Sequence, residues 1–256
     1  HIDLTLPLPP DSGCFRMSSN GLASGNHPLE AISHAICELI ERDATTLWFR
    51  RDRRAQDRTR IDLATVDDAN CRALLDRYER AGIHVAVWDT TTDIGIASFL
   101  CQIAEAPGAG ARPVSGAHGM GCHFDRRIGL LRALTEAAQC RLTWISGSRD
   151  DGRAEDYDCS PDAIRRERDS MQEHGSLRSF RAVPTREADS FDADLRWALD
   201  RLKAVGIDEV VAVDLTRPEF RIPVVRVIIP GLEHVGFGEG LASYVPGPRG
   251  HSICRR

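Results

Sequence analysis

The most regular pattern of apolar and polar positions lies between residues 26 and 49. Apolar side chains recur there every three or four positions, so at about 100° per residue they fall on one arc. That arc comprises Leu29, Ile32, Ala35, Ile36, Leu39 and Ile40. Asn26 is placed to cap such a helix, and Pro28 suits its first turn. The pattern predicts a helix from Asn26 to about Phe49, with the apolar arc facing a core.

Similar patterns predict the remaining elements. Helical periodicity recurs at residues 65–81, 127–145, 161–174 and 192–205. The helix at 127–145 is apolar on most sides and is expected to be central. Strands are predicted at residues 84–88, 96–103, 209–215 and 223–230, the last two buried. Residues 50–60 indicate a basic loop. Because helices and strands alternate irregularly, without a repeat or linker, we predict a single α+β domain over residues 1–256, with a mixed β-sheet flanked by helices.

The side of helix 26–49 opposite the apolar arc carries a stripe of polar residues. It consists of Asn26, Glu30, His34, Glu38 and Glu41. Glu38 and Glu41 are like-charged neighbours one turn apart, which is mildly unfavourable, and only Glu38 has a cation, Arg42, four residues on. The stripe is either a solvated acidic face or a site for a hard cation, because carboxylate oxygens suit Mg²⁺. Spacing alone leaves both open.

Other chemical patterns are weaker. His34 and Cys37 lie one turn apart, as a Cys–His nucleophile would require, but nothing else resembles such a site. A second group could supply metal ligands: His118, Cys122 and His123. The glycines of the segment 116–121 do not match a dinucleotide-binding fingerprint, and no helix follows them promptly.

Composition excludes several classes of protein. The 256 residues carry a formal net charge of −5, which does not favour nucleic-acid binding. Lys203 is the only lysine and does not follow a glycine, so a Walker A loop is excluded. The 8 cysteines form no Cys-x-x-Cys pair and indicate reduced thiols. No apolar run approaches the roughly 18 residues of a membrane span, and no secretory signal is visible. We expect a cytoplasmic protein.

Longer motifs add a family resemblance. Residues 19–31 read Ser-Asn-Gly-Leu-Ala-Ser-Gly-Asn-His-Pro-Leu-Glu-Ala, and residues 38–43 read Glu-Leu-Ile-Glu-Arg-Asp. This combination resembles the YcaO superfamily. Residues 133–141 with 147–151, and residues 222–233, resemble further parts of the same family. Because these stretches follow the family order along nearly the whole chain, the resemblance is specific.

The resemblance implies a fold that cradles ATP and Mg²⁺ without a P-loop. Carried over position by position, it implies metal ligation by Glu30, Glu38 and Glu41. It also places a set of groups at the nucleotide: Asn26, Glu30, Arg42, Glu136, Gln139 and Arg141. The family needs no protein nucleophile, so no catalytic residue is assigned.

The resemblance further implies that the protein activates backbone amides of a ribosomally made peptide, at the expense of ATP. Azoline, thioamide and amidine products all occur in the family. The chain lacks the Pro-x-Pro-x-Pro tail of azoline-forming members, and residues 147–151 and 214–220 resemble the branch that works with TfuA-type partners. We therefore expect thioamide formation with a TfuA-like partner, and azoline formation next; a homodimer is compatible with this. The alternatives are a non-catalytic peptide-binding scaffold and a carboxylate-metal phosphohydrolase.

Two departures from the family pattern concern completeness. Members often read Ser-Ala-Gly-Asn where this chain has Ala23-Ser24-Gly25-Asn26, so Ser24 would have to replace the usual serine. An earlier Ser-x-x-x-Glu-x-x-Glu-Arg segment, which supplies further carboxylates, has no match upstream of Ser18. We therefore expect the chain to be the C-terminal part of a longer protein, with an incomplete nucleotide site.

Overall fold

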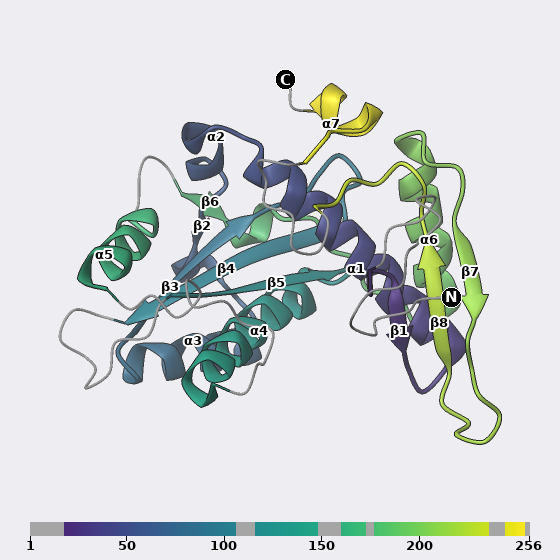
Figure 1. Ribbon diagram of the computed structural model, residues 1–256, viewed down its shortest axis with the longest axis horizontal. Helices are drawn as coiled ribbons and strands as arrows, with labels where there is room; N and C mark the ends of the chain where they lie inside the picture. The colour runs from purple at the N-terminus through teal and green to yellow at the C-terminus, as the bar shows by residue number, and fades with distance from the viewer. Residues whose placement is uncertain (1–17, 106–115, 148–159, 173–176, 236–243, 254–256) are drawn as a thin grey trace. The chain divides into compact units, whose positions relative to one another are not determined.

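The computed structural model describes residues 18–105, 116–147, 160–172, 177–235 and 244–253 (Figure 1). The chain divides into two compact units. Unit 1 comprises His1–Arg51 and Ala188–Arg256, and unit 2 comprises Asp52–Glu187. Each combines helices with small sheets, so the predicted α+β class is confirmed, with the strands distributed over three sheets. Among the described helices, none has the length and apolar character that crossing a membrane requires.

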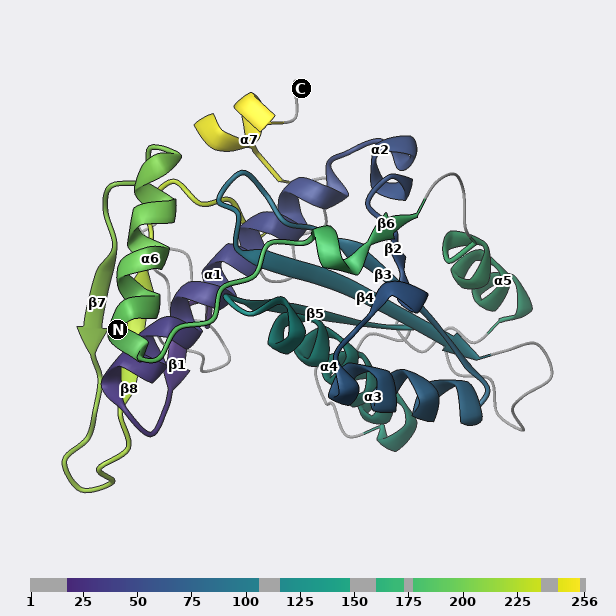
Figure 2. The same cartoon turned by 180° about the vertical axis from the view of Figure 1, so that it is seen from behind.

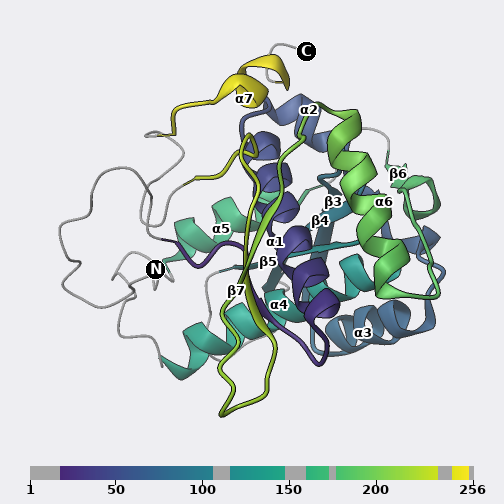
Figure 3. The same cartoon turned by 90° about the vertical axis from the view of Figure 1, so that its right-hand side faces the viewer.

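Unit 1 is built around one antiparallel sheet and one long helix. The sheet has the order β1 (Leu22–Ser24), β8 (Val224–Ile228) and β7 (Val211–Asp214). Helix α1 (Pro28–Phe49) contacts β1, β8 and the helix α6 (Phe191–Ala204), and Figure 3 shows α1 and α6 side by side. The short helix α7 (Pro248–Ile253) ends the described part of the unit.

The ends of α1 follow the prediction with one correction. The helix ends at Phe49, but its N-cap is His27, whose Nδ1 accepts a hydrogen bond from the Leu29 N–H at 3.2 Å. Asn26 does not cap the helix, because its side chain is bound to Glu30 instead. A cap needs only a side-chain acceptor at the helix start, so neighbouring polar residues compete for that position.

The two C-terminal strands form, but β7 is not buried. All four of its residues are exposed, whereas Val225 and Val227 of β8 are buried. The reason is position in the sheet. Strand β8 lies between two neighbours and contacts α1, whereas β7 lies at the edge of the sheet beyond β8. A β-branched run indicates a strand but does not distinguish an edge strand from a central one.

Unit 2 contains an antiparallel sheet in the order β3 (Ile83–Asp89), β4 (Ala97–Glu105) and β5 (Ala117–His123). Helices α3 (Ala69–Arg80) and α4 (Arg126–Ser146) lie side by side on this sheet (Figure 2). The remaining elements are smaller: α2 (Arg53–Asp57), β2 (Ile61–Asp62), the 3-10 helix η1 (Leu63–Thr65), α5 (Pro161–Ser170), β6 (Arg178–Ser179) and the 3-10 helix η3 (Phe180–Ala182). Strands β2 and β6 pair in parallel.

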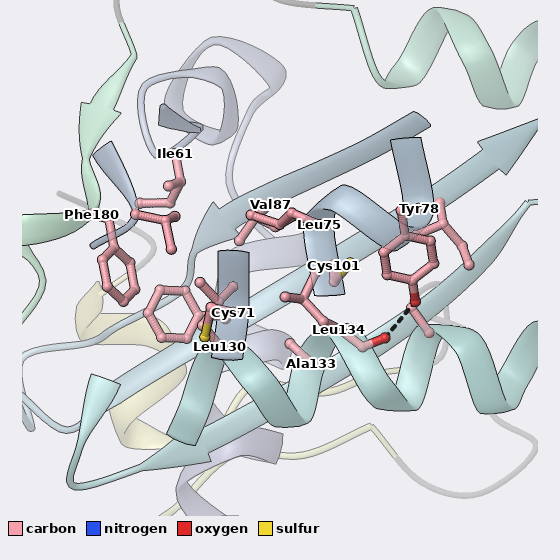
Figure 4. Packing of buried hydrophobic residues seen from close by; sticks show 14 of the residues in the cluster. Ile61, Cys71, Leu75, Tyr78, Val87, Cys101, Leu130, Ala133, Leu134 and Phe180 are labelled. Atoms are coloured by element: carbon pink, nitrogen blue, oxygen red, sulfur yellow. Dashed lines mark hydrogen bonds between the residues drawn. The ribbon is translucent and has the colours of Figure 1, made fainter. Parts of the chain in front are cut away.

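The core of unit 2 lies between α3, α4 and the sheet (Figure 4). Phe99 and Phe180 are fully buried, with ring centroids 5.9 Å apart. The buried Tyr78 hydroxyl of α3 donates a 2.6 Å hydrogen bond to the Leu134 carbonyl of α4. The predicted central position of α4 is only partly right. One stripe of small and apolar residues is buried, whereas Ile128, Leu142 and Ile145 are more than one third exposed.

Strand β5 was missed because glycine is a poor strand former. A Cβ atom at Gly119 would lie 2.2 Å from the Ala133 carbonyl oxygen, and one at Gly121 would lie 2.1 Å from the Gly129 carbonyl oxygen. These glycines therefore let β5 approach the backbone of α4. The glycine pattern at residues 116–121 serves strand–helix packing in this structure.

Local capping explains two further boundary differences. The predicted basic loop contains α2, whose N-cap Asp52 accepts a hydrogen bond from the Ala55 N–H at 2.8 Å. The helix predicted at 65–81 begins instead at Ala69, where Asp68 accepts a hydrogen bond from the Cys71 N–H at 2.9 Å. Both are ordinary Asp caps, which apolar periodicity alone does not locate.

Candidate functional site

The first candidate residues lie where the small-residue loop enters α1. Glu30 Oε2 accepts hydrogen bonds from the Asn26 backbone N–H at 2.7 Å and from its side-chain amide at 3.2 Å. A Cβ atom at Gly25 would lie 3.1 Å from the same carboxylate oxygen. The predicted proximity of Asn26 and Glu30 is therefore present, and the loop closes tightly over the first turn of the helix.

Two turns further along, Glu38 is joined to the other end of this loop. Its Oε2 accepts a 2.9 Å hydrogen bond from the Gly21 N–H. Gly21 has φ 76°, and a Cβ atom there would lie 2.2 Å from the Val227 carbonyl oxygen. Only glycine combines this left-handed conformation with such a close approach. Gly21 thus connects the Glu38 carboxylate directly to strand β8.

Arg42 lies between the two remaining carboxylates of the stripe. Its Nη2 is 3.9 Å from Glu38 Oε1 and 3.8 Å from Glu41 Oε1. The sequence predicted a partner for Glu38 only; in the structure one guanidinium offsets the repulsion between both. Glu41 is only 3% exposed, so of the two readings left open for the stripe, the solvated acidic face does not apply to this residue. A carboxylate this buried is not part of a solvated acidic surface.

The donor chemistry of this stripe fits a hard cation. Carboxylate oxygens are the ligands that Mg²⁺ prefers, and Mg²⁺ commonly takes one or two of them together with phosphate oxygens and water. Within the described ranges, no group of three or more His, Cys, Asp or Glu side chains could hold a metal ion alone. Glu30 precedes Glu38 by eight residues, about 12 Å of helix rise. The three carboxylates therefore do not form one closed metal site, and phosphate groups would have to complete the coordination.

A cavity of about 890 Å³ adjoins this part of unit 1. Its lining includes Leu39 and Arg42 of α1, Arg226 of β8, and Glu233. The Arg226 guanidinium donates a 2.6 Å hydrogen bond to the Ser18 carbonyl. Burial lowers the pKa of Arg226, and the charge of Glu38 opposes that shift. Positive charge therefore lines a largely apolar cavity beside the carboxylate stripe.

Sequence reasoning missed a second charged cluster in unit 1. Asp43 is fully buried, and its carboxylate accepts hydrogen bonds from Arg249 Nε at 3.0 and 3.1 Å and from the Glu233 N–H at 2.9 Å. The Glu233 carboxylate accepts hydrogen bonds from the Tyr244 hydroxyl at 2.5 Å and from the N–H groups of Gly247 and Gly250 at 3.0 and 2.7 Å.

The two carboxyl groups of this cluster have opposite pKa shifts. Burial raises the pKa of Asp43, although hydrogen bonding and charge from Arg249 oppose the rise. Burial also disfavours the charged form of Glu233, but its hydrogen bonds and the Arg249 charge outweigh that effect and lower its pKa. A signal for Asp43 was present in the sequence: it follows Ile36 and Ile40 at helical spacing, so it lies on the apolar stripe.

The candidate residues of α4 belong to unit 2. Glu136 is half-buried and Gln139 is exposed. Arg141 Nη2 forms a 2.6 Å ion pair with Glu105 of β4, so part of its role is to join helix and sheet. Their predicted place at a nucleotide stays a prediction. Residues 148–151 of the related motif lie outside the described residues.

The weaker candidates do not assemble into sites. Cys37 is buried whereas His34 is exposed, which does not favour a Cys–His nucleophile. His118 lies 3.6 Å from Glu167, Cys122 is buried, and His123 Nδ1 accepts a hydrogen bond from the Asp125 N–H. In the part of the chain that the structure describes, these residues do not gather as metal ligands.

Comparison with known proteins identifies the family. The profile described as YcaO cyclodehydratase, ATP- and Mg²⁺-binding, matches residues 2–233. An uncharacterized protein in the tfuA 3′ region of Rhizobium leguminosarum bv. trifolii is 41% identical over 225 residues, which cover 86% of this chain and 53% of that protein. The chain spans about half the length of the curated relatives it matches.

Solved structures agree with the sequence match. A heterocyclase in complex with substrate and cofactor is 28% identical, with a TM-score of 0.72 over 89% of this chain and 30% of that one. The YcaO protein from Methanopyrus kandleri bound with AMPPCP and Mg²⁺ is 21% identical, with a TM-score of 0.66 over 89% of this chain and 58% of that one, and shares the fold. By fold and by a profile match over most of its length, the chain belongs to the YcaO family.

Proposed function

We propose that the protein containing this chain is an ATP- and Mg²⁺-dependent enzyme that activates backbone amides of a ribosomally made peptide in the cytoplasm. The observation that carries this proposal is the arrangement on α1. Arg42 lies between Glu38 and the buried Glu41, in a chain of the YcaO family. Opposite charges at this spacing suit a bound polyphosphate with its cation.

Each residue of α1 has a distinct role in this proposal. Glu38 and Glu41 hold Mg²⁺ together with phosphate oxygens, and Arg42 neutralises charge on the phosphates. Glu30, two turns away, serves a separate cation, and Asn26 orients its carboxylate through the two hydrogen bonds that join them. ATP, when bound with Mg²⁺, supplies the phosphoryl group that turns the amide oxygen into a phosphate leaving group.

The residues proposed on α4 complete the nucleotide-binding set. Glu136 and Gln139 are assigned to the nucleotide from the family resemblance. Arg141 joins them, although its ion pair with Glu105 already fixes its guanidinium. No protein nucleophile is needed, because the attacking group belongs to the peptide or to a sulfur donor. Catalysis then consists of positioning and charge neutralisation.

We propose thioamide formation as the reaction, with a TfuA-like protein delivering sulfur. The tfuA-region relative at 41% identity supports this choice. A sulfur nucleophile adds to the amide carbon, the carbonyl oxygen leaves as phosphate, and a carbon–sulfur double bond replaces the carbon–oxygen one. Azoline formation would instead use a Cys, Ser or Thr side chain of the peptide and remove one water.

The test uses the full-length protein with its peptide, ATP, Mg²⁺ and a sulfur source. Glu41→Gln should lower peptide-dependent phosphate release by roughly 100-fold or more, because it removes a carboxylate that holds the Mg²⁺ bound to the phosphates. Glu79→Gln, the same change at an exposed position of α3, is the control and should keep full activity. Normal turnover by the Glu41 variant would contradict the metal assignment.

The same experiment separates the competing functions. Mass spectrometry of the peptide should show oxygen-to-sulfur exchange, whereas loss of one water would favour azoline formation. Phosphate release without any peptide would favour a carboxylate-metal phosphohydrolase. Peptide binding with neither ATP consumption nor a mass change would favour a non-catalytic scaffold.

A further inference from the structure

The roles proposed for α1 above leave out one feature of unit 1, a buried ionic network formed by Asp43, Glu233 and Arg249. Asp43 has no exposed surface, and the Arg249 side chain that pairs with it is only 9% exposed. Burying an ion pair removes two charges from water, and replacing such a pair by apolar residues is often neutral or stabilising. Stability alone is therefore a poor reason for placing this network in a core.

The network joins three separate parts of the chain. Asp43 belongs to α1, Glu233 follows β8, and Arg249 belongs to α7. Arg249 Nε is within 3.1 Å of both Asp43 oxygens, and the Glu233 N–H bonds to one of them. One carboxylate on α1 thus holds both the chain at residue 233 and the C-terminal segment 244–253.

The C-terminal segment fits closely around the Glu233 carboxylate. Tyr244, Gly247 and Gly250 all donate hydrogen bonds to it. A Cβ atom at Gly247 would lie 2.9 Å from Glu233 Oε1, and one at Gly250 would lie 2.7 Å from the Tyr244 hydroxyl oxygen. The segment is therefore seated by specific polar contacts, and a side chain at either glycine would displace one of the groups that make them.

The position of the network on α1 connects it to the candidate site. Asp43 directly follows Glu41 and Arg42 in the same helical turn. Glu233 lines the cavity of about 890 Å³ that Arg42 also lines. Fixing Asp43 and Glu233 together therefore fixes both the helix that presents Arg42 and an adjacent wall of the cavity.

We propose that Asp43, Glu233 and Arg249 are positioning residues, which seat the C-terminal segment 244–253 on α1 and so hold Glu41 and Arg42 in their working orientation. This rests on the proposed function for its catalytic consequence, but not for its structural one. In metal sites, residues that hydrogen-bond to the metal ligands orient them in the same way, and loss of such a residue costs about 10- to 100-fold in affinity or activity.

The test compares Arg249→Ala and Arg249→Lys with the wild-type full-length protein. The control is Arg196→Ala, which removes an arginine of α6 whose side chain is 76% exposed. The first readout is hydrogen exchange across residues 38–46 without any ligand, at a temperature where every variant is folded. Arg249→Ala should exchange at least tenfold faster there than the control, and Arg249→Lys should recover part of the protection because it keeps the charge.

The second readout is peptide-dependent ATP turnover. Arg249→Ala should lower kcat by about 10- to 100-fold with a much smaller change in KM for ATP, and Arg249→Lys should restore part of kcat. Exchange and kcat equal to those of Arg196→Ala would overturn the proposal. If the wild type shows no turnover, the proposed function fails, and the exchange readout still decides on the network.

If Arg249→Ala does not fold, Tyr244→Phe and Arg249→Lys take its place. Tyr244→Phe removes one hydrogen bond from the network and no charge, so its exchange at residues 38–46 should rise above that of the control. Unchanged exchange in both of these folded variants would equally overturn the proposal.

Discussion

Both long helices bury an apolar stripe, but only α1 also buries carboxylates. Each lies on a three-stranded antiparallel sheet of its own unit. Helix α1 buries Asp43 and Glu41, which are 0% and 3% exposed, beside apolar residues such as Ile36, Ile40 and Leu47. Helix α4 buries a stripe of small and apolar residues: Gly129, Leu130, Ala133, Leu134 and Ala137.

The difference shows what each helix is suited to do. Helix α4 packs closely against the glycines of β5 without burying a charged side chain, which suits a rigid scaffold. Buried carboxylates are unfavourable unless cations and hydrogen bonds compensate them. On α1 these compensating groups are Arg42 and Arg249. Buried ionisable groups that are paired with charges mark functional sites more often than buried apolar residues do.

Two arginines, one on each helix, provide the largest expected contrast. Arg42→Gln removes the cation between Glu38 and Glu41 and should lower peptide-dependent phosphate release by roughly 100-fold. Arg141→Gln should lower it by about tenfold and also reduce stability, because it breaks the 2.6 Å ion pair with Glu105. Steady-state kinetics and urea unfolding of both full-length variants would measure the two effects.

Equal losses of activity would contradict this contrast. If Arg141→Gln reduced the rate as much as Arg42→Gln without loss of stability, its main contact would be with the nucleotide. Arg126→Gln is a further control on α4. This arginine donates hydrogen bonds to the carbonyl oxygens of Arg181 and Val183 within unit 2 and has no assigned role at the nucleotide, so its loss should affect stability rather than the rate.

Periodicity predicted α1 and α4 almost to their ends, because both have apolar stripes with the helical repeat. It failed at β5, where Gly119 and Gly121 remove the signal of a strand and only the neighbouring helix explains them. It also failed to rank β7 as exposed, since edge position depends on pairing between distant segments. Local pattern thus finds elements, whereas their environment comes from tertiary contacts.

The arrangement of the candidate site was predicted in a similar, partial way. Spacing and family resemblance found the carboxylates of α1 and Arg42, and the structure brings Glu38, Glu41 and Arg42 together. The ionic network around Asp43 was missed because its partners lie 190 and 206 residues further along the chain. No local pattern joins residues at such separation. A charged residue on an apolar stripe was the one usable sign.

The packing of α4 against β5 allows a second prediction, on stability. Gly119→Ala should destabilise the protein by about 1–3 kcal/mol, because the new methyl group would overlap the backbone of α4 at Ala133 and Ala137. Ala138→Ser, on the exposed side of the same helix, should change the unfolding free energy by less than about 0.5 kcal/mol. Urea unfolding measures both. An equally small effect at Gly119 would show that helix and strand separate easily.

The smallest expected effect is a difference in pH dependence between two hydrogen bonds, one to a carboxylate and one to a neutral carbonyl. Tyr244 donates to the Glu233 carboxylate of unit 1, whereas Tyr78 donates to the Leu134 carbonyl of unit 2. Removing either hydroxyl with Tyr→Phe should cost about 1–2 kcal/mol at pH 7. Only the first loss involves a group that titrates in the acid range.

The sign follows from the lowered pKa of Glu233, whose ordinary value is 4.5. A lowered folded-state pKa adds stability above the unfolded-state value, and this contribution disappears as the pH falls through the folded-state value. Tyr244→Phe brings the pKa of Glu233 back toward 4.5, so its destabilisation should shrink as the pH is lowered from 7 to 3. The Tyr78→Phe destabilisation should stay constant, because no charge is involved. Parallel curves of unfolding free energy against pH for the two variants would show that Tyr244 does not stabilise the Glu233 charge.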